Sequence, residues 1–335
     1  MPITRLLLLT FLAALPCAAD EPFTFRRPCM GTVWTVKLYA ADEKSAQAAA
    51  DGAFARVEEL NGILSDYNQD SELSRLSATA GSGKPMTVTG DLFAVLALSQ
   101  QAASESGGVF DITIGPCVQL WRTAKKTRRL PSAEALTAAR AATGWESLVL
   151  DEKARTALLK KPGMKLDLGG IAKGFAQDEA MKVLREKFHI TSALIDAGGS
   201  PHVSARPPGR DGWVIQLAKT HDDDPDVRLR VENVCVDTSG DLNQFVEIEG
   251  RRYSHIIDKE TGLGMVDSTL GTVILPSAAV ADWLATTLCV MGPEKGIAFL
   301  ARTYPEAQAR IARRGPDGKL TVKETAGFAA LLVKK

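Results

Sequence analysis

The sequence lacks an excess of charge of either sign. Its 335 residues carry 40 Lys and Arg against 40 Asp and Glu, so the formal net charge is zero. A surface without net charge has no general attraction for nucleic acid or for an anionic membrane. We therefore expect no nucleic-acid partner, and any anionic ligand must be bound by local groups.

Long apolar runs are also scarce, and one of them indicates export. The run from Leu6 to Leu15 follows Arg5 and ends in 16–19, Pro-Cys-Ala-Ala. As a helix it would be about 15 Å long, too short for a bilayer core of about 30 Å. This pattern is typical of a secretory signal. We expect residues 1–19 to be a signal peptide and the protein to be periplasmic. Lipid anchoring at Cys17 is the alternative, and Pro16 disfavours it.

Cysteine is rare, with five residues in the chain. Their spacings match no metal signature. After export, Cys29, Cys117, Cys235 and Cys289 would lie where disulfides can form, but the sequence assigns no pairs. Cys117 and Cys289 have apolar neighbours, which predicts that they are buried as small apolar side chains.

The chain has the composition of a folded protein, with 45% hydrophobic and 24% charged residues. Internal repeats, coiled coils and a separating linker are lacking, so we expect one α+β domain over residues 20–335. It would have mixed sheets flanked by helices, in one lobe or in two with the binding site between them. Apolar spacing predicts helices over 43–64, 91–104, 172–188, 277–290 and 293–302. Strands are predicted over 32–39, 164–168, 192–196, 213–218, 227–236, 244–248, 253–257 and 271–275.

Lys125–Arg129 is a run rich in basic residues that we place in a loop. It is interpreted either as a solvated surface segment or as a contact to a phosphate or a partner.

A glycine turn, Asp167–Gly174, separates a predicted strand from a predicted helix. Glycines at such a junction let the backbone approach a ligand and point amide groups at an anion. The spacing fits no known phosphate-loop fingerprint, so an ordinary tight turn is the alternative. Asp167 and Lys173 at the two ends favour a ligand site, since they supply an acceptor and a cation.

Asp282 and Thr286 are spaced four apart in a predicted helix that is otherwise apolar. Residues four apart share a helix face, so their oxygens project together. A carboxylate and a hydroxyl are ligands of the type Mg²⁺ takes. The alternative is that Asp282 pairs with a basic group and that Thr286 bonds to its own helix backbone.

His255 ends a predicted strand just before a turn at 258–262, and it is one of four histidines. A neutral imidazole at the edge of a ligand loop can act as a base. The alternative is a structural hydrogen-bond partner. Asp258 with Thr261 and Gly262 is typical of a turn.

In chain order these segments resemble the ApbE family of FAD:protein FMN transferases. The resemblance covers nearly the whole chain after the signal. It rests on Met30–Thr32, Leu64–Ser74, Gly107–Pro116 with Leu120-Trp121, Leu166–Gly174, Asp196–Gly199, Ser239–Asp241, His255–Gly262 and Ala281–Thr286 with Gly292. Ala285 is a departure, because relatives can carry a second carboxylate there. The residue after Asp258 is Lys259, where the family usually has proline.

The resemblance implies a role for each matching position. Mg²⁺ would be bound by Asp282 and Thr286, with a backbone carbonyl of Gly170 or Ala172. His255 would act as the base and Lys173 would assist at the phosphates. FAD would be contacted by Met30, Tyr67, Val109, Phe110, Asp111, Asp167, Lys173 and Ile257.

The resemblance also implies the reaction, in which FAD is the substrate. The enzyme would cleave it, attach FMN to a Ser or Thr of a second protein through a phosphoester, and release AMP. The acceptor would be a membrane redox subunit with a Ser/Thr-Gly-Ala-Thr-like site. Two alternatives remain, an FAD pyrophosphatase that yields FMN and AMP and a periplasmic flavin carrier without turnover.

Overall fold

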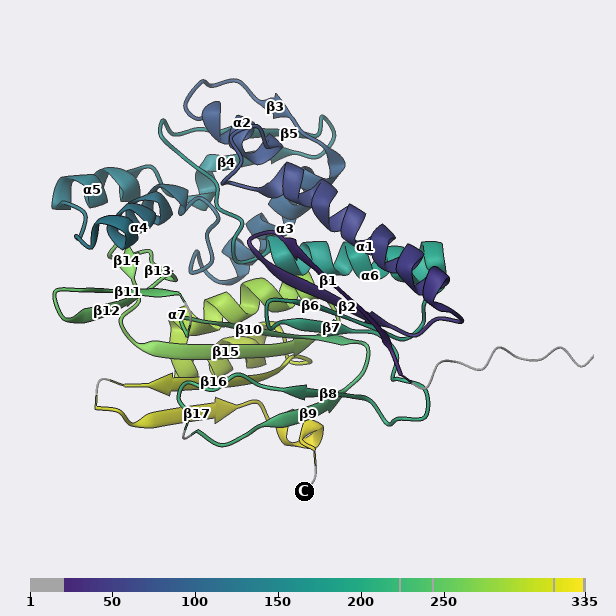
Figure 1. The fold of residues 1–335 in the computed structure, drawn as a ribbon. Coiled ribbons are helices and arrows are strands. Elements are labelled where there is room, and N and C mark those ends of the chain that lie inside the picture. The colour runs from purple at the N-terminus through teal and green to yellow at the C-terminus, as the bar shows by residue number, and fades with distance from the viewer. Residues whose placement is uncertain (1–20, 223, 243, 316, 334–335) are drawn as a thin grey trace, which may run out of the picture.

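The computed structural model describes residues 21–222, 224–242, 244–315 and 317–333 (Figure 1). The predicted signal peptide 1–19, with Cys17, lies outside these residues. No helix in the described part of the chain has the length and apolar character needed to cross a membrane.

The helices are α1 Glu43–Leu64, α2 Glu72–Ala78, α3 Gly90–Glu105, α4 Gly115–Thr127, α5 Ala133–Ala141, α6 Ala172–Phe188 and α7 Ala278–Thr303, with 3-10 turns η1 Trp145–Ser147 and η2 Phe328–Leu331. The strands are β1 Phe23–Cys29, β2 Thr32–Leu38, β3 Met86–Thr87, β4 Leu148–Asp151, β5 Thr156–Leu159, β6 Ala193–Ala197, β7 Pro201–Val203, β8 Trp213–Gln216, β9 Arg228–Val231, β10 Val234–Gly240, β11 Phe245–Ile248, β12 Arg251–Ser254, β13 Ile257–Asp258, β14 Leu263–Gly264, β15 Ser268–Leu275, β16 Gln308–Arg314 and β17 Leu320–Glu324.

The main sheet has eight strands in the order β1-β2-β6-β7-β10-β15-β16-β17, and every neighbouring pair is antiparallel. Side chains alternate between its two faces, so both faces can be buried. In β6, Ile195 belongs to the core beneath α1, α6 and α7, whereas Leu194 packs in a second cluster with β8, β9 and η2 (Figure 1). The predicted α+β class is confirmed.

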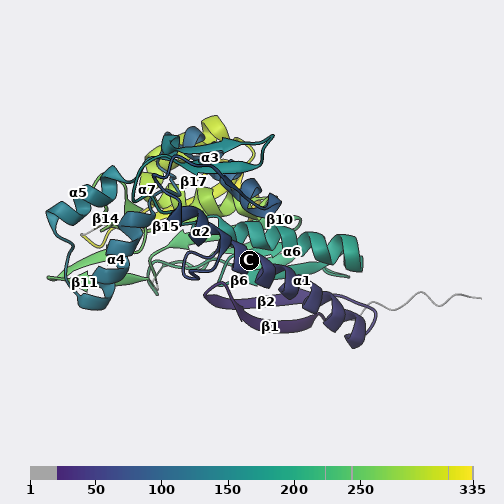
Figure 2. The ribbon, with the colours of Figure 1, turned by 90° about the horizontal axis from the view of Figure 1, so that it is seen from above.

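A second group of elements packs above these helices. It contains the small sheet β3-β5-β4 with α2 and α3, and it continues into the α4–α5 pair beside the hairpins β11–β12 and β13–β14 (Figure 2). Leu73 of α2, Leu92 of α3 and Leu159 of β5 belong to the same apolar core cluster as Ile195. One continuous core therefore runs through both groups.

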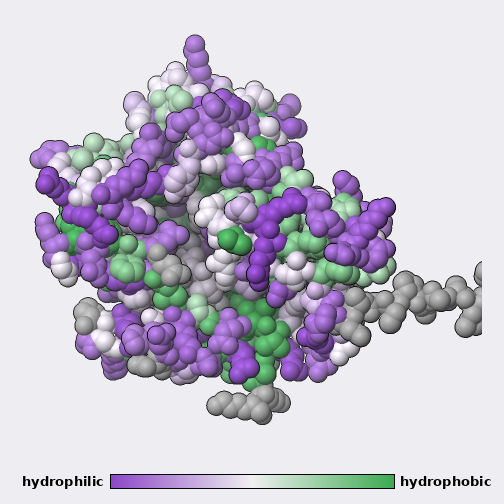
Figure 3. Space-filling view, viewed as in Figure 1, coloured by the Kyte–Doolittle hydropathy of each residue, from purple (hydrophilic) through white to green (hydrophobic). Residues whose placement is uncertain are grey.

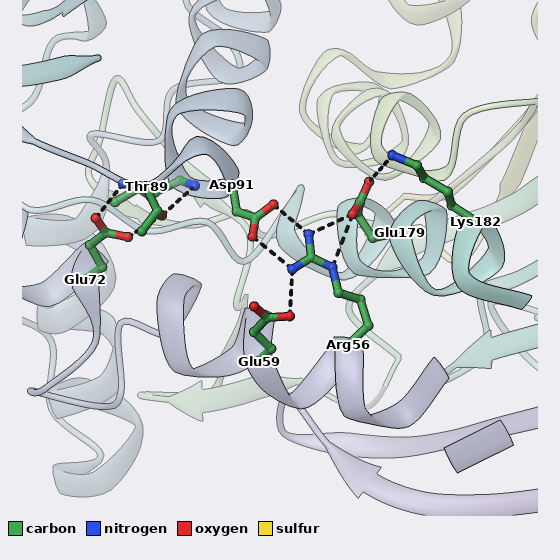
Figure 4. Close-up of polar contacts among 8 residues, drawn as sticks. Arg56, Glu59, Glu72, Thr89, Asp91, Glu179 and Lys182 are labelled. Carbon is green, nitrogen blue, oxygen red and sulfur yellow. Dashed lines mark hydrogen bonds and ion pairs between the residues drawn. The ribbon is translucent and has the colours of Figure 1, made fainter. Parts of the chain in front are cut away.

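Arg56 of α1 ties three helices together (Figure 4). Its guanidinium binds Asp91 of α3 at 2.6 Å and Glu179 of α6 at 2.7 Å, and it also bonds Glu59 on its own helix. A planar guanidinium with five donors can bind several carboxylates at once. Nearby, Glu72 of α2 accepts from the amide and hydroxyl of Thr89, the residue that caps α3.

Helices α6 and α7 cross very closely and cap each other. A Cβ added at Gly174 would lie 2.2 Å from the Ala278 carbonyl oxygen, so only glycine fits there. Asp178 of α6 accepts from the Ala278 and Ala279 amides and the Ser277 hydroxyl at the start of α7. In return, Asp282 of α7 accepts from the Gly174 amide in the first turn of α6. Each carboxylate satisfies amides that a helix start leaves unpaired.

Several sequence predictions need correction. The predicted strand 164–168 is wrong, because Lys165 alone forms a bridge, to Ile114, between turns on either side. The strand 227–236 is instead β9 and β10, divided where Asn233 has a positive φ. By contrast, the break predicted between the helices 277–290 and 293–302 is confirmed, because Gly292 within α7 has a non-helical backbone with φ 75° and ψ −179°. Lys125 lies in the last turn of α4 and not in a loop.

Other expectations hold. The helices predicted over 43–64 and 172–188 are α1 and α6 with the same bounds. Cys117 and Cys289 are buried as predicted, and the four described cysteines are unpaired.

The Gly174 contact gives a test of the crossing. Gly174→Ala forces a methyl group against backbone, so we expect it to lower the free energy of unfolding by more than about 2 kcal/mol. The control is Gly62→Ala in α1, where nothing lies within 4 Å of the added Cβ. That change is expected to be neutral or stabilising by up to about 1 kcal/mol. Urea denaturation of both variants checks this, and equal effects would contradict the close contact.

Candidate active site

The glycine turn leads directly into α6. Asp167 Oδ1 accepts from the Gly169 amide at 2.8 Å, which closes the turn, and the Lys173 ammonium donates to the Gly169 carbonyl at 3.2 Å. In a regular helix the Gly174 amide would donate to the carbonyl of Gly170. Here it donates to Asp282 at 3.0 Å. The Gly170 carbonyl thus has no backbone donor among the described residues.

Thr286 of α7 lies against the same turn. A Cβ at Gly170 would be 3.1 Å from Thr286 Oγ1, and this hydroxyl shares a 3.0 Å hydrogen bond with Ser239 of β10. Thr286 therefore does not bond to its own helix backbone. The structure brings together one carboxylate, one hydroxyl and one free carbonyl, from Asp282, Thr286 and Gly170.

These oxygens are of the type that a hard cation binds. The structure also distinguishes between the two carbonyl ligands that the sequence left open. Ala172 is the first residue of α6, so its carbonyl enters the regular helical ladder, whereas that of Gly170 does not. The geometry favours Gly170 of the two predicted carbonyl ligands. Within the described residues no three His, Cys, Asp or Glu side chains gather as a metal site, so any cation here would depend on hydroxyl and carbonyl oxygens as well.

Asp237 of β10 adds a second buried carboxylate, which the sequence analysis missed. It is 3% exposed, and Asp282 is 2% exposed. Burial, together with the nearby Asp282 carboxylate, raises the pKa of Asp237 to about 7. Burial also raises the pKa of Asp282. Two carboxylates in one apolar setting repel each other, and a cation relieves that repulsion.

Lys173 is the cation that faces these carboxylates. The pKa of Lys173 is raised, mainly by Asp282 and also by Asp237 and Asp167. Its ammonium group therefore stays charged beside the start of α6, where the helix dipole also favours anions.

Asp167 belongs to a second chain of contacts. Arg122 of α4 donates to Asp167 at 3.1 Å and to Asp66 at 2.6 Å, and its guanidinium lies 3.9 Å from the centre of the Tyr67 ring. Burial, with a contribution from Asp66, raises the pKa of Asp167 to about 6. Arg122 thus joins two predicted FAD residues, Tyr67 and Asp167, and the Tyr67 side chain is 75% exposed.

The predicted segment Val109–Asp111 lies beside the turn through Phe110. The Phe110 ring is 3.2 Å from the Cβ position of Gly170, and it packs on Trp283 with ring centres 5.8 Å apart. The Asp111 carboxylate already accepts from Thr113 and Trp145 and pairs with Lys259 at 2.9 Å. A ligand contact from Asp111 would therefore come from its backbone.

His255 is the residue directly after β12, at the edge of the candidate site. Its Nδ1 lies 3.2 Å from the Gln244 carbonyl, and its ring centre is 6.3 Å from that of Trp121. Burial, together with the cations Lys173 and Lys125, lowers the pKa of His255 to about 4. The ring is neutral at pH 7, so it is free to accept a proton.

The remaining predicted residues surround this group. Met30 occupies the β1–β2 turn with a positive φ, and Ile257 pairs with Gly264 in a two-stranded hairpin. No polar or ring contact in the described structure joins Met30, Val109 or Ile257 to the residues above. Their contacts to FAD stay predictions. In Figure 3 the surface is recessed between α4 and the centre of the molecule.

The missed residues had only weak signals. Asp237 directly follows the predicted strand 227–236, so the sequence placed it just beyond a strand, whereas in the structure it lies in the middle of β10. Arg122 lies in α4, a helix that the sequence did not predict. Its partners are 45 and 56 positions away in sequence, which no local pattern can reveal.

The shifted pKa of Asp237 makes stability depend on pH. Because the pKa in the folded protein lies near 7, above the ordinary value near 4, the folded state holds this proton more tightly. Asp237 then contributes stability that is complete below about pH 4 and is lost as pH rises through about 7. Asp237→Asn should gain stability relative to the parent, by at least about 1 kcal/mol, between pH 5 and pH 8. Denaturation with EDTA present measures this, and parallel pH profiles would contradict it.

Comparison with known proteins shows which family this chain belongs to. The model of the ApbE family matches residues 30–311. An FAD:protein FMN transferase of Vibrio cholerae is 34% identical over 282 residues, 81% of this chain and 82% of that protein. One of Klebsiella pneumoniae is 31% identical over 308 residues, 89% of this chain and 84% of that protein.

Solved structures give the same result. The crystal structure of the apo form of the Pseudomonas stutzeri flavinyl transferase ApbE has a TM-score of 0.82 and 30% identity, and it covers 94% of this chain and 98% of that one. The flavin transferase ApbE of Vibrio cholerae has a TM-score of 0.82 and 29% identity, over 94% of this chain and 100% of that one. The resemblance predicted from the sequence motifs is therefore confirmed, and this chain belongs to the ApbE family.

Proposed function

We propose that this chain is a Mg²⁺-dependent FAD:protein FMN transferase. It cleaves the diphosphate of FAD, attaches FMN by a phosphoester to a Ser or Thr of an acceptor protein, and releases AMP. Family membership and the activity named for the relatives support the transferase. The observation that carries the mechanism is the oxygen set of Asp282, Thr286 and Gly170 beside Lys173.

The residues present fit Mg²⁺. Asp282 supplies a carboxylate, and Thr286 supplies a hydroxyl. Gly170 supplies a carbonyl that is free because the Gly174 amide donates to Asp282 instead. These are hard oxygen ligands of the kind this ion takes, together with water and phosphate oxygens. When bound, Mg²⁺ neutralises phosphate charge and so makes the phosphorus easier to attack. Asp237 adds negative charge near the site.

Lys173 and the start of α6 bind the diphosphate from the protein side. The Lys173 ammonium is a fixed cation at the amino end of a helix, where peptide dipoles also favour an anion. These groups are in place before the substrate arrives, so they orient the phosphates without rearrangement.

His255 would accept the proton of the acceptor hydroxyl. The hydroxyl oxygen attacks the phosphorus of the FMN half, a new P–O bond forms, and the P–O bond to AMP breaks. AMP leaves with the bridging oxygen, and the proton passes to the imidazole Nε2, because Nδ1 carries the hydrogen that it donates to the Gln244 carbonyl. The lowered pKa keeps His255 neutral in the free protein. Binding of the anionic diphosphate raises that pKa, which strengthens the base at the moment it is needed.

The place of action is also part of the proposal. The pattern over residues 1–19 supports export to the periplasm, with the acceptor a membrane redox subunit.

The first experiment incubates the purified protein with FAD and an acceptor peptide, with and without Mg²⁺. We expect AMP release that requires Mg²⁺, together with a gain of one FMN mass on the peptide. Free FMN and AMP without peptide modification would indicate a hydrolase. Intact FAD under every condition would indicate a carrier.

Asp282→Asn tests the metal ligand. The asparagine carbonyl can still accept from the Gly174 amide, so the helix crossing should survive. We expect loss of transfer by at least about a hundredfold, with a higher Mg²⁺ requirement. The matched control is Asp178→Asn, which alters the reciprocal helix cap without touching the oxygen set. Equal losses in both variants, at equal stability, would contradict the role of Asp282.

His255→Ala tests the base. A general base contributes about a hundredfold or more, so the transfer rate should fall by that amount while FAD binding changes little. Rapid-quench measurement of peptide flavinylation and fluorescence titration of FAD give the two values. A rate within about twofold of the parent would exclude His255 as the base.

A further inference from the structure

The end of α4 carries a dense patch of unpaired positive charge. From residue 112 to 133 the chain has five cations and no acidic residue. We define the α4 basic patch as its four exposed members, Lys125, Lys126, Arg128 and Arg129. Figure 3 shows hydrophilic side chains over this α4–α5 side of the molecule.

Several exposed cations elsewhere in the protein are paired, whereas the exposed Lys84, Lys153 and Lys160 lack an ion pair in the described structure but are spread around the β3-β5-β4 sheet. Arg27 pairs with Asp51, Arg185 with Glu186, Arg210 with Glu21 and Arg230 with Asp211. No residue of the α4 basic patch has an ion pair within the described part of the chain. In a protein without net charge, four unpaired cations within five residues are a local positive excess that attracts an anionic partner.

The dipole of α4 explains the presence of only some of the cations in the α4 basic patch. Cations in the last turn of a helix interact favourably with its dipole, which accounts for Lys125 and Lys126. Arg128 is the residue after the helix, in the left-handed conformation, and Arg129 follows it. These two lie beyond the turn where the dipole effect is large, and neither binds a terminal carbonyl in the described structure.

The patch is continuous with the proposed base. The Lys125 ammonium lies 5.2 Å from the centre of the Trp121 ring, and that ring is 6.3 Å from His255. The charge of Lys125 also contributes to the lowered pKa of His255. One aromatic ring therefore separates the edge of the patch from the place where the acceptor hydroxyl loses its proton.

We propose that the α4 basic patch docks an acidic segment of the acceptor protein, next to the Ser or Thr that receives FMN. This inference rests on the proposed function and adds the surface and the charge of its partner. FAD is a poor occupant, because its phosphates are expected at Lys173 inside the site. An anionic membrane fits less well, since the patch adjoins the reacting group and its helical neighbours Thr123 and Thr127 are polar.

The test compares two acceptor peptides with the same central Thr-containing site. One has Asp and Glu at the flanking positions, and the other has Asn and Gln there. With the parent protein, we expect kcat/KM for flavinylation to be at least about tenfold higher for the acidic peptide at low salt, through KM. Rising salt should reduce this preference.

The patch variant is the triple change Lys126→Glu, Arg128→Glu and Arg129→Glu, which leaves Lys125 in place beside Trp121. The matched control is Lys84→Glu, Lys153→Glu and Lys160→Glu, three exposed lysines around the β3-β5-β4 sheet with the same total charge change. The patch variant should lose or reverse the preference and retain the parent's rate on the neutral peptide. The control should keep the preference.

Each outcome separates the two proposals. If neither peptide gains FMN with the parent protein, the proposed function fails first. If both are modified without preference, or if the control variant loses the preference equally, the docking surface is wrong. Binding of the parent but not the patch variant to vesicles of anionic phospholipid, without a peptide preference, would assign the patch to a membrane instead.

Discussion

The crossing of α6 and α7 organises the site through a single short contact. Gly174 has no side chain, so the backbone of α6 can touch the start of α7. At that distance each helix reaches the unpaired amides of the other, and Asp178 and Asp282 cap them reciprocally. The contact fixes where α6 begins relative to the face of α7 that carries Thr286. Without it, the glycine turn and the oxygens of α7 would have no defined relation.

The same crossing explains why one backbone hydrogen bond is missing at the start of α6, the bond from the Gly174 amide to the Gly170 carbonyl. Because Asp282 takes the amide of Gly174, the carbonyl of Gly170 loses its regular donor. The cap that stabilises α6 thus also creates a free oxygen beside Thr286. Packing, capping and ligand chemistry here are consequences of one geometric constraint.

Local patterns in the sequence predicted the elements that carry the crossing. The helices 43–64 and 172–188 have regular apolar spacing, and their bounds match α1 and α6. The four-residue spacing of Asp282 and Thr286 placed both on one face of α7. Short or irregular segments were harder to predict from the sequence. The segment 164–168 has the apolar content of a strand, but one bridge at Lys165 is all it forms, because turns on both sides leave it no length to pair.

Contacts between distant segments could not be predicted from one sequence. In the sequence Asp237 is an ordinary acidic residue, but the fold buries it in the middle of β10 near Asp282, and this burial raises its pKa. The role of Arg122 becomes apparent only in the structure, where α4 places it beside Asp66 and Asp167. Lys125–Arg129 was visible as charge, but its position beside Trp121 and His255 depends on the hairpins that follow β10. The family resemblance supplied roles for single residues, and the structure supplied their partners.

The two oxygens of the Asp282 carboxylate have different partners, and this difference affects which ion the site would accept. Its Oδ2 already accepts from the Gly174 amide, whereas Oδ1 accepts no hydrogen bond in the described structure and is the oxygen freer to coordinate a cation. Calcium commonly takes carboxylates through both oxygens and tolerates seven or eight ligands at longer distances, whereas magnesium prefers single oxygens in a compact octahedron. A carboxylate held in this way favours binding a cation through one oxygen, and this preference comes from a hydrogen bond that also caps the start of α6.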